Sequence, residues 1–261
     1  MQSPFDEPGR IFANKRPLEE DYTPDTILCR DEEIDRYSEA LQDVIEGFGP
    51  NNVFIYGQTG NGKTVVTRVM MDHLQNETHK HDVDLTILEV NCNKHDSIFN
   101  VLLELVNQLR DPDDQVKDQG PTKGYLWNTL YDELDRLGGD VLVVLDEVDM
   151  LGHDNDKLLY DFPRARKNGD LENARIGVIG ISNNHMFKDE LDPRVKSTLC
   201  ESEIFFSPYD ATQLSEILDH YAGLVFKDSV LEDGVIPLCA AKAAQEQGDA
   251  REALDLMETA G

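Results

Sequence analysis

The chain has 261 residues, 39% of them hydrophobic, which suits one large domain or one domain with a small appendage. Its 52 acidic residues against 24 basic ones give a formal net charge of −28, dispersed along the sequence rather than gathered in a tail. No apolar run approaches the ~20 residues of a membrane-spanning helix, the N-terminus lacks the basic and apolar regions of a secretory leader, and the four cysteines are scattered without a C-x-x-C pair. These features predict a cytoplasmic protein with reduced thiols, and they disfavour a disulfide scaffold, a membrane protein and a broad basic surface for DNA.

The dispersed negative charge predicts adaptation to salt. A charge of this size repels itself in dilute buffer, and such self-repulsion is typical of halophilic proteins. At molar salt the Debye length falls to about 3 Å, so the repulsion is largely screened. We therefore expect a salt-rich cytoplasm. The alternative, an acidic surface for a basic partner, would suit a clustered charge better.

The first predicted elements lead into a glycine-rich loop. After a polar, proline-bearing arm, residues 31–45 carry apolar side chains on one helical face. Residues 51–56 form a short apolar run that predicts a buried strand, and residues 64–74 have apolar positions at helical spacing. A strand, a loop and a helix therefore follow one another.

The loop between that strand and that helix reads G-x-x-x-x-G-K-[ST], with the residues Gly57, Gln58, Thr59, Gly60, Asn61, Gly62, Lys63 and Thr64. Its glycines allow backbone N–H groups to curl round an anion, and the helix N-terminus adds a partial positive charge. We predict a nucleoside triphosphate site in which Lys63 reaches the β- and γ-phosphates and Thr64 ligates Mg²⁺. A chance glycine-rich turn is the alternative, which the flanking strand and helix disfavour.

The rest of the chain alternates strands and helices and then becomes helical only. Strands are predicted at 85–92, 141–145, 176–181 and 203–206. Helices are predicted at 97–109 with Ser97 as its cap, at 126–137 ended by Gly138 and Gly139, at 157–166, and, beyond Pro208, at 211–225, 238–247 and 252–259. Residues 110–124 form a polar, turn-rich connection. The pattern predicts an α/β fold, a parallel sheet with helices on both faces, over residues 1–207 and a small helical piece over residues 208–261.

Polar residues follow two of the predicted strands. Asp146 and Glu147 come directly after residues 141–145, at the carboxyl edge where α/β folds bind ligands. Asp146 suits Mg²⁺ coordination through water, and Glu147 suits polarisation of an attacking water. In so acidic a chain, two solvated carboxylates are the alternative. Asn183 ends the next strand, where an amide can orient water or touch a γ-phosphate, although a turn-forming asparagine fits as well.

Two arginines and two histidines complete the candidates. Arg194 and Arg251 suit contact with a γ-phosphate, and each suits a surface ion pair equally well. His79 and His81 lie in a polar connection without further His or Cys at ligand spacing, so a solvated loop is predicted there rather than a metal site.

The order of these motifs resembles the AAA+ ATPases and, within them, the archaeal origin-recognition replication initiators of haloarchaeal type. These are relatives of the eukaryotic origin-recognition and cell-division-cycle loading factors. The motifs that carry the resemblance are Ile11-Phe12, Tyr22-Thr-Pro24, Arg30-Asp-Glu-Glu33, the run from Asn52 to Thr64, Val143-Val-Leu-Asp-Glu-Val-Asp149, Gly180-Ile-Ser-Asn183, Leu191-Asp-Pro-Arg-Val-Lys-Ser197 and Gly248-Asp-Ala-Arg-Glu-Ala-Leu-Asp255.

The resemblance assigns a role to each candidate. It implies that Gly60 to Thr64 form Walker A, that Asp146 and Glu147 form Walker B, and that Asn183 is sensor 1. It further implies that Arg194 is an arginine finger acting on a neighbour's nucleotide and that Arg251 is sensor 2. The implied fold is a five-stranded parallel sheet with a helical lid. The implied ligands are ATP or ADP with Mg²⁺, and a DNA-touching insertion is implied near residues 110–125.

The implied function is that of a slowly hydrolysing ATPase switch in origin recognition or helicase loading. Its implied partners are origin DNA, other initiator subunits or the replicative helicase.

The alternative is a truncated, non-catalytic paralogue that holds nucleotide and pairs with full-length initiators. A clamp-loader type of AAA+ protein is disfavoured by the amino-acid sequence of residues 191–197. Family members continue past sensor 2 into a winged-helix domain. Because this chain stops at Gly261, we expect a short paralogue or a fragment, with weak or indirect contact to DNA.

Overall fold

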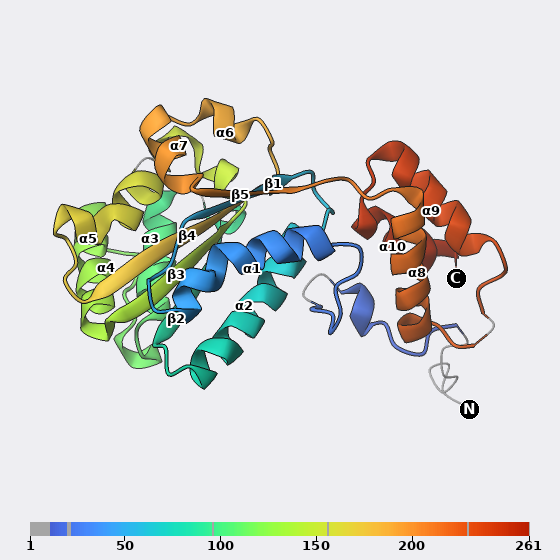
Figure 1. The fold of residues 1–261 in the computed structure, drawn as a ribbon, viewed down its shortest axis with the longest axis horizontal. Helices are drawn as coiled ribbons and strands as arrows, with labels where there is room; N and C mark the ends of the chain where they lie inside the picture. Colours follow the sequence, from blue (N-terminus) through green and yellow to red (C-terminus); the bar gives the residue numbers. More distant parts are fainter. Residues whose placement is uncertain (1–10, 20–21, 96, 156, 229, 261) are drawn as a thin grey trace. The chain divides into compact units, whose positions relative to one another are not determined.

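The computed structural model describes residues 11–19, 22–95, 97–155, 157–228 and 230–260 and contains a five-stranded sheet (Figure 1). The spatial order of its strands is β2-β3-β4-β1-β5. The pairings β1–β4, β2–β3 and β3–β4 are parallel. The strands are β1 (Val53–Gly57), β2 (Leu85–Asn91), β3 (Gly139–Asp146), β4 (Ala174–Ser182) and β5 (Ser202–Phe206). The prediction of an α/β fold with a parallel sheet is confirmed.

The helices connect the strands and then continue alone. In chain order they are α1 (Asp31–Ile45), α2 (Lys63–Lys80), α3 (Ile98–Gln108), α4 (Lys123–Leu137), α5 (Ala165–Asn168), α6 (Phe187–Glu190), α7 (Pro193–Leu199), α8 (Ala211–Val225), α9 (Val235–Glu246) and α10 (Ala250–Ala260). In Figure 1, α1 lies on one face of the sheet and α3 and α4 lie on the other. None of the described helices is long and apolar enough to cross a membrane.

The chain separates into two compact units. The sheet unit consists of Glu32–Gly57 and Met70–Phe205, and the loop–lid unit consists of Met1–Asp31, Gln58–Val69 and Phe206–Gly261. Each is described by itself below. The polar arm that the sequence assigns to the N-terminus lies outside the described residues over residues 1–10. The division of the chain into domains at residue 207 stays a prediction.

The core of the sheet unit is built on strand β3. All residues from Val141 to Leu145 are buried, as expected for a central parallel strand that is covered on both faces. Helices α3 and α4 pack against this sheet with apolar faces that include Leu102, Leu105 and Leu130, all fully buried. Helix α4 ends at Leu137, and its C-cap Gly138 has a φ of +72°, which suits a residue without a side chain, so the predicted stop is confirmed.

In the loop–lid unit, helices α8, α9 and α10 form the lid. Asp210 caps α8 by accepting from the backbone N–H groups of Thr212 and Gln213, while the Gln213 side chain bonds the Asp210 backbone N–H. The lid core contains Leu214, Ala243 and Met257, each fully buried. The lid is therefore a small packed body of its own.

Three local predictions are wrong, two of them because of a proline. Residues 157–166 do not form one α-helix: a π-helical turn (Lys157–Asp161) and a 3-10 turn (Phe162–Arg164) precede α5. Pro163 explains the break, because proline has no N–H to donate and its ring clashes with the preceding helical turn. Helix α9 begins at Val235, three residues early, since Pro237 is tolerated in a first turn. Ser97 occupies the cap position of α3, but its side chain makes no capping hydrogen bond.

Candidate nucleotide site

The glycine-rich loop is compact and holds its lysine inside. Gly60 and Gly62 adopt φ angles of +73° and +87°, a left-handed region that glycine enters without strain. Lys63 begins α2 and is only 4% exposed. Its Nζ donates to the carbonyl oxygen of Gln58 at 2.7 Å, so the ammonium is folded back over the loop. Thr64 follows in the first turn of α2 and is half-buried.

The N-terminus of α10 lies against the same loop. The backbone N–H of Ala250 donates to the carbonyl oxygen of Gly60 at 3.2 Å. The Asp249 carboxylate caps α10 by accepting from the backbone N–H groups of Arg251 at 2.7 Å and Glu252 at 3.2 Å. Arg251 is exposed on this first turn. The N-terminus of α10, capped by its own carboxylate, therefore meets the loop within the loop–lid unit, and the N-terminus of α2, which continues directly from the loop, favours an anion.

Gly60 also has no room for a side chain. A Cβ there would lie 1.7 Å from Oδ1 of Asp249. Because that carboxylate is committed to capping α10, moving it aside would remove the cap, which is worth about 1 kcal/mol. In the sequence, Asp249 is one residue of the motif from Gly248 to Asp255. Its contact with the loop could not be predicted, because no local sequence signal indicates it.

The Gly60→Ala substitution is therefore expected to cost more stability than Gly47→Ala. Both glycines have similar φ values, +73° and +79°, so both alanines carry a left-handed strain of about 1–2 kcal/mol. The added Cβ meets Asp249 at position 60 and nothing within 4 Å at position 47. Thermal unfolding in the same KCl buffer measures the difference, and equal losses in the two variants would show that the Asp249 contact is unimportant.

In the sheet unit, Asp146, Glu147 and Asn183 lie together. Glu147 has a φ of +53°, and its backbone N–H donates to Oδ1 of Asp146 at 2.9 Å. The Asn183 side-chain Nδ2 donates to Oε1 of Glu147 at 3.0 Å. The backbone N–H of Asn183 donates to Oδ1 of Asp149 at 3.2 Å. Left-handed φ values in residues other than glycine cluster at functional sites.

The parallel register explains why these residues meet. Leu145 of β3 is opposite Gly180 of β4, and Tyr56 of β1 is opposite Ser182 of β4. The three strands consequently end at one edge of the sheet, and the chain enters the glycine-rich loop directly after β1. This is the carboxyl edge at which parallel α/β sheets bind ligands.

A buried thiol lies beside the same carboxylates. Burial, together with the smaller effect of the negative charges of Asp146, Asp149 and Glu147, raises the pKa of Cys92 to about 12. Cys92 therefore stays a neutral thiol at neutral pH. It contributes packing rather than a nucleophile.

Arg194 lies at the start of α7 and is exposed. Its Nε donates to Oδ1 of Asp192 at 3.1 Å, and the same oxygen caps α7 by accepting from the Arg194 backbone N–H at 2.9 Å. These bonds hold the pKa of Asp192 below its ordinary value. The Arg194 guanidinium also lies 5.7 Å from the ring centroid of Tyr160. The arginine is thus oriented by its own subunit while it remains at the surface.

The connection at 110–124 and the two histidines near the end of α2 were also considered as candidate sites in the sequence. The connection at 110–124 contains a 3-10 turn at Pro112–Asp114 and is anchored by an ion pair between Arg110 and Glu133 at 2.7 Å. His79, in the last turn of α2, and His81, just after it, are both exposed. Among the described residues no three His, Cys, Asp or Glu side chains gather at a spacing that would hold a metal ion.

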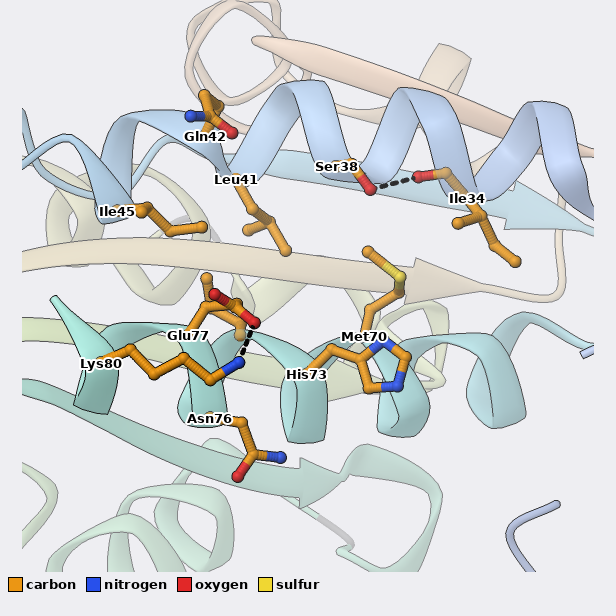
Figure 2. Close-up of a pocket in the computed structure, with 11 residues that line it drawn as sticks. Ile34, Ser38, Leu41, Gln42, Ile45, Met70, His73, Asn76, Glu77 and Lys80 are labelled. Atoms are coloured by element: carbon orange, nitrogen blue, oxygen red, sulfur yellow. Dashed lines mark hydrogen bonds and ion pairs between the residues drawn. The ribbon is translucent and has the colours of Figure 1, made fainter. Parts of the chain in front are cut away.

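A separate pocket of about 600 Å³ lies between α1 and α2 in the sheet unit (Figure 2). Its apolar lining includes Leu41, Ile45 and Met70, and its rim carries an ion pair between Lys80 and Glu77 at 2.6 Å. None of the residues predicted for the nucleotide site lines this pocket, and sequence reasoning did not point to it.

Comparison with known proteins identifies the family. The family described as AAA domain matches residues 45–181, and the one described as Cdc6 AAA+ ATPase-type lid domain matches residues 215–261. The chain is 48% identical over 258 residues to ORC1-type DNA replication protein 15 of Haloarcula marismortui, covering 98% of the chain and 63% of that relative. It is likewise 48% identical over 258 residues to ORC1-type DNA replication protein 10 of Halobacterium salinarum, covering 98% and 62%.

The fold has a solved counterpart as well. The Aeropyrum pernix ORC1 protein, solved in complex with DNA, matches with a TM-score of 0.86 and 34% identity, covering 97% of this chain and 64% of that one. The chain therefore spans somewhat less than two thirds of the length of these relatives. From the matched AAA and lid segments and the shared fold, the chain belongs to the AAA+ ATPases of the archaeal ORC1/Cdc6 replication-initiator family.

Proposed function

We propose that the chain is the ATP-binding and ATP-hydrolysing part of a DNA replication initiator. Its nucleotide state would control association with DNA or with replication partners. The observation that carries the proposal is the glycine-rich loop that Lys63 covers and the N-terminus of α10 contacts. Similarity to ORC1-type replication proteins over nearly the whole chain supports the biological setting.

Within the loop–lid unit, each group has a role toward the phosphates. The loop N–H groups and the α2 N-terminus bind phosphate oxygens, and Lys63 turns from the Gln58 carbonyl to the β- and γ-phosphates. Arg251 adds a positive charge from the first turn of α10, a helix whose start is fixed to Gly60. Titration calorimetry with ATP and ADP in molar KCl tests this assignment, and a well-folded chain that binds neither nucleotide would refute it.

Thr64 and Asp146 are the residues that would hold Mg²⁺. A hydroxyl and a carboxylate are the hard oxygen donors that this ion prefers, and Mg²⁺ typically combines one or two carboxylates with waters and substrate phosphates. A half-buried Asp146 at the end of β3 fits that donor set. When bound, the ion would neutralise charge on the phosphate oxygens.

Hydrolysis would depend on Glu147. Asn183 donates to Oε1 of this carboxylate, which fixes its plane, and we assign Oε2 to the attacking water. The same bond favours a second candidate function. If Asn183 keeps Glu147 from the water, the chain holds nucleotide without turning it over and acts as an interaction module for other initiator subunits.

We propose that Arg194 acts on the nucleotide of a neighbouring subunit. Arg194→Ala is then expected to leave ATP affinity unchanged and to reduce phosphate release by about tenfold or more, because arginine fingers supply large rate factors. Mixing Arg194→Ala with Lys63→Ala chains should restore release, since each variant supplies what the other lacks. Arg166→Ala, on the exposed surface of α5, is the control. Loss of ATP affinity in Arg194→Ala alone would contradict a role in trans.

Direct contact of this chain with DNA is proposed to be weak. In the connection at 110–124, the exposed Lys117 and Lys123 are outnumbered by acidic residues at positions 111, 113, 114 and 118. Phosphate contacts also weaken steeply with salt. We propose that origin DNA, the replicative helicase or other initiator subunits are engaged together with further parts of the assembly. Fluorescence anisotropy of a labelled duplex, with and without ATP at high salt, measures the contribution of the chain alone.

A further inference from the structure

Arg30 is a buried charge directed at the glycine-rich loop. It is 1% exposed and immediately precedes α1. A guanidinium stays charged in proteins, and its burial is costly unless its donors are satisfied. Its Nε donates to the carbonyl oxygen of Asn61 at 3.1 Å, and its Nη2 donates to that of Ser207 at 2.7 Å. Its central carbon lies 3.7 Å from the ring centroid of Tyr209, which adds a cation–π contact.

Asn61 is held a second time through its side chain. The residue is fully buried, and its Nδ2 donates to the carbonyl oxygen of Phe206 at 3.0 Å. Main chain and side chain of this loop residue are thus both bonded to neighbours within the loop–lid unit. Phe206 ends β5 and Ser207 begins the connection to α8, so the same contacts reach the chain that leads into the lid.

Holding these carbonyls determines where the loop N–H groups point. In a planar trans peptide the C=O and the following N–H point in opposite directions, and the described residues contain no cis peptide bond. Because Arg30 holds the Asn61 carbonyl, the N–H of Gly62 is turned to the opposite side. Because the Ala250 N–H holds the Gly60 carbonyl, the N–H of Asn61 is turned away from α10. Neither N–H group is therefore directed at the partner of its own peptide carbonyl, and successive loop N–H groups are the donors from which anion-binding concavities are built.

We propose that Arg30 is a positioning residue of the nucleotide site. By holding the Asn61 carbonyl it aims the Gly62 N–H at the phosphates of the bound nucleotide, and by bonding Ser207 it links that orientation to the lid. Arg30 itself does not touch the nucleotide. This role rests on the proposed nucleotide binding and goes beyond it, because it assigns the loop conformation to a residue outside the loop motif.

The test follows the Gly62 amide by NMR. Labelling asparagine with ¹³C at its carbonyl carbon and glycine with ¹⁵N selects Asn–Gly pairs, which occur twice, at Asn61-Gly62 and at Asn168-Gly169. Gly169, exposed at the end of α5, is the internal control. In the wild-type chain, saturating ADP is expected to move the Gly62 amide proton downfield, because the N–H gains a charged acceptor, and to leave Gly169 unchanged.

In Arg30→Met, the Gly62 shift at saturating ADP is expected to be at least halved, with ADP bound about tenfold more weakly because a charge-assisted hydrogen bond that orients the loop is lost. Arg36→Met, at an exposed site on α1, should match the wild type. Met257→Ala, which removes a buried side chain from the lid core, should lower the melting temperature and retain the Gly62 shift. That comparison separates positioning from stability.

A folded Arg30→Met chain with the wild-type Gly62 shift and ADP affinity would overturn the proposal. Should Arg30→Met not fold, Arg30→Lys carries the test, since an ammonium lacks the fork that bonds two carbonyls and a partial loss is expected; wild-type values in that variant would overturn it equally. Absence of ADP binding by the folded wild-type chain would refute the proposed function, and this role with it. Normal ADP binding that no Arg30 variant alters would refute the Arg30 role alone.

Discussion

Lys63→Ala is expected to weaken ATP and ADP binding by about 100-fold or more, as measured by titration calorimetry in molar KCl. Lys63 is buried at the start of α2, and its ammonium already bonds a carbonyl of the loop that would hold the phosphates. Losing a hydrogen bond that involves a charged group costs about 1.5–3 kcal/mol, and the lost attraction to phosphate adds to it. A total near 3 kcal/mol corresponds to about 100-fold in the dissociation constant.

Lys80→Ala is the matched control for this substitution. Lys80 ends the same helix, is exposed and pairs with Glu77. Its replacement therefore makes the same change in net charge as Lys63→Ala, but at the opposite end of the helix from the loop. Nucleotide affinity should stay at the wild-type value, and melting temperatures without nucleotide should show that both variants fold. A folded Lys63→Ala chain that binds ADP as tightly as the wild type would contradict the site.

Glu147→Gln is expected to reduce phosphate release by about 100-fold or more while ATP binding is retained. General-base catalysis commonly contributes about 10²–10⁴-fold, and an amide does not accept the proton of the attacking water. The geometry should survive, because the amide oxygen of glutamine still accepts from Asn183 Nδ2 and the left-handed φ of +53° suits both residues equally. The measurement is single-turnover phosphate release under saturating ATP.

The same experiment decides between the two candidate functions. Glu104→Gln makes the same charge change at an exposed position on α3 and should release phosphate at the wild-type rate. If wild type and Glu147→Gln release phosphate equally slowly, the chain is the non-catalytic nucleotide-holding module. A drop confined to Glu147→Gln establishes the ATPase.

The strands could be predicted well because their signal is local. The continuous apolar run from Val141 to Leu145 specifies a strand covered on both faces, and β3 contains it entirely. The segment at 157–166 failed because apolar periodicity outweighed Pro163 in the prediction, whereas loss of the N–H and the ring clash decide the backbone. Element interiors therefore followed from the sequence, and the interrupted segment did not.

For the candidate site, the sequence predicted which residues lie at the carboxyl edge of the sheet but not which of them bond to one another. Because parallel strands end together, Glu147 and Asn183 were expected at one edge of the sheet. The bond between them depends on the β3–β4 register and on the unusual φ of Glu147, which the sequence does not encode locally. The sequence showed Arg30 only as one residue of the motif from Arg30 to Glu33 and indicated no role for its side chain. Its burial against loop carbonyls arises from segments 31 and 177 residues away.

The hydrogen bond between Ala250 and Gly60 gives the lid a built-in reporter. The Ala250 amide proton can exchange with deuterium in the solvent only when the start of α10 leaves the loop. When reclosure is faster than chemical exchange, the slowing of this one amide measures the free energy of that separation. Hydrogen exchange at this one backbone amide, without any added label, therefore measures how much ATP or ADP stabilises the contact between α10 and the loop.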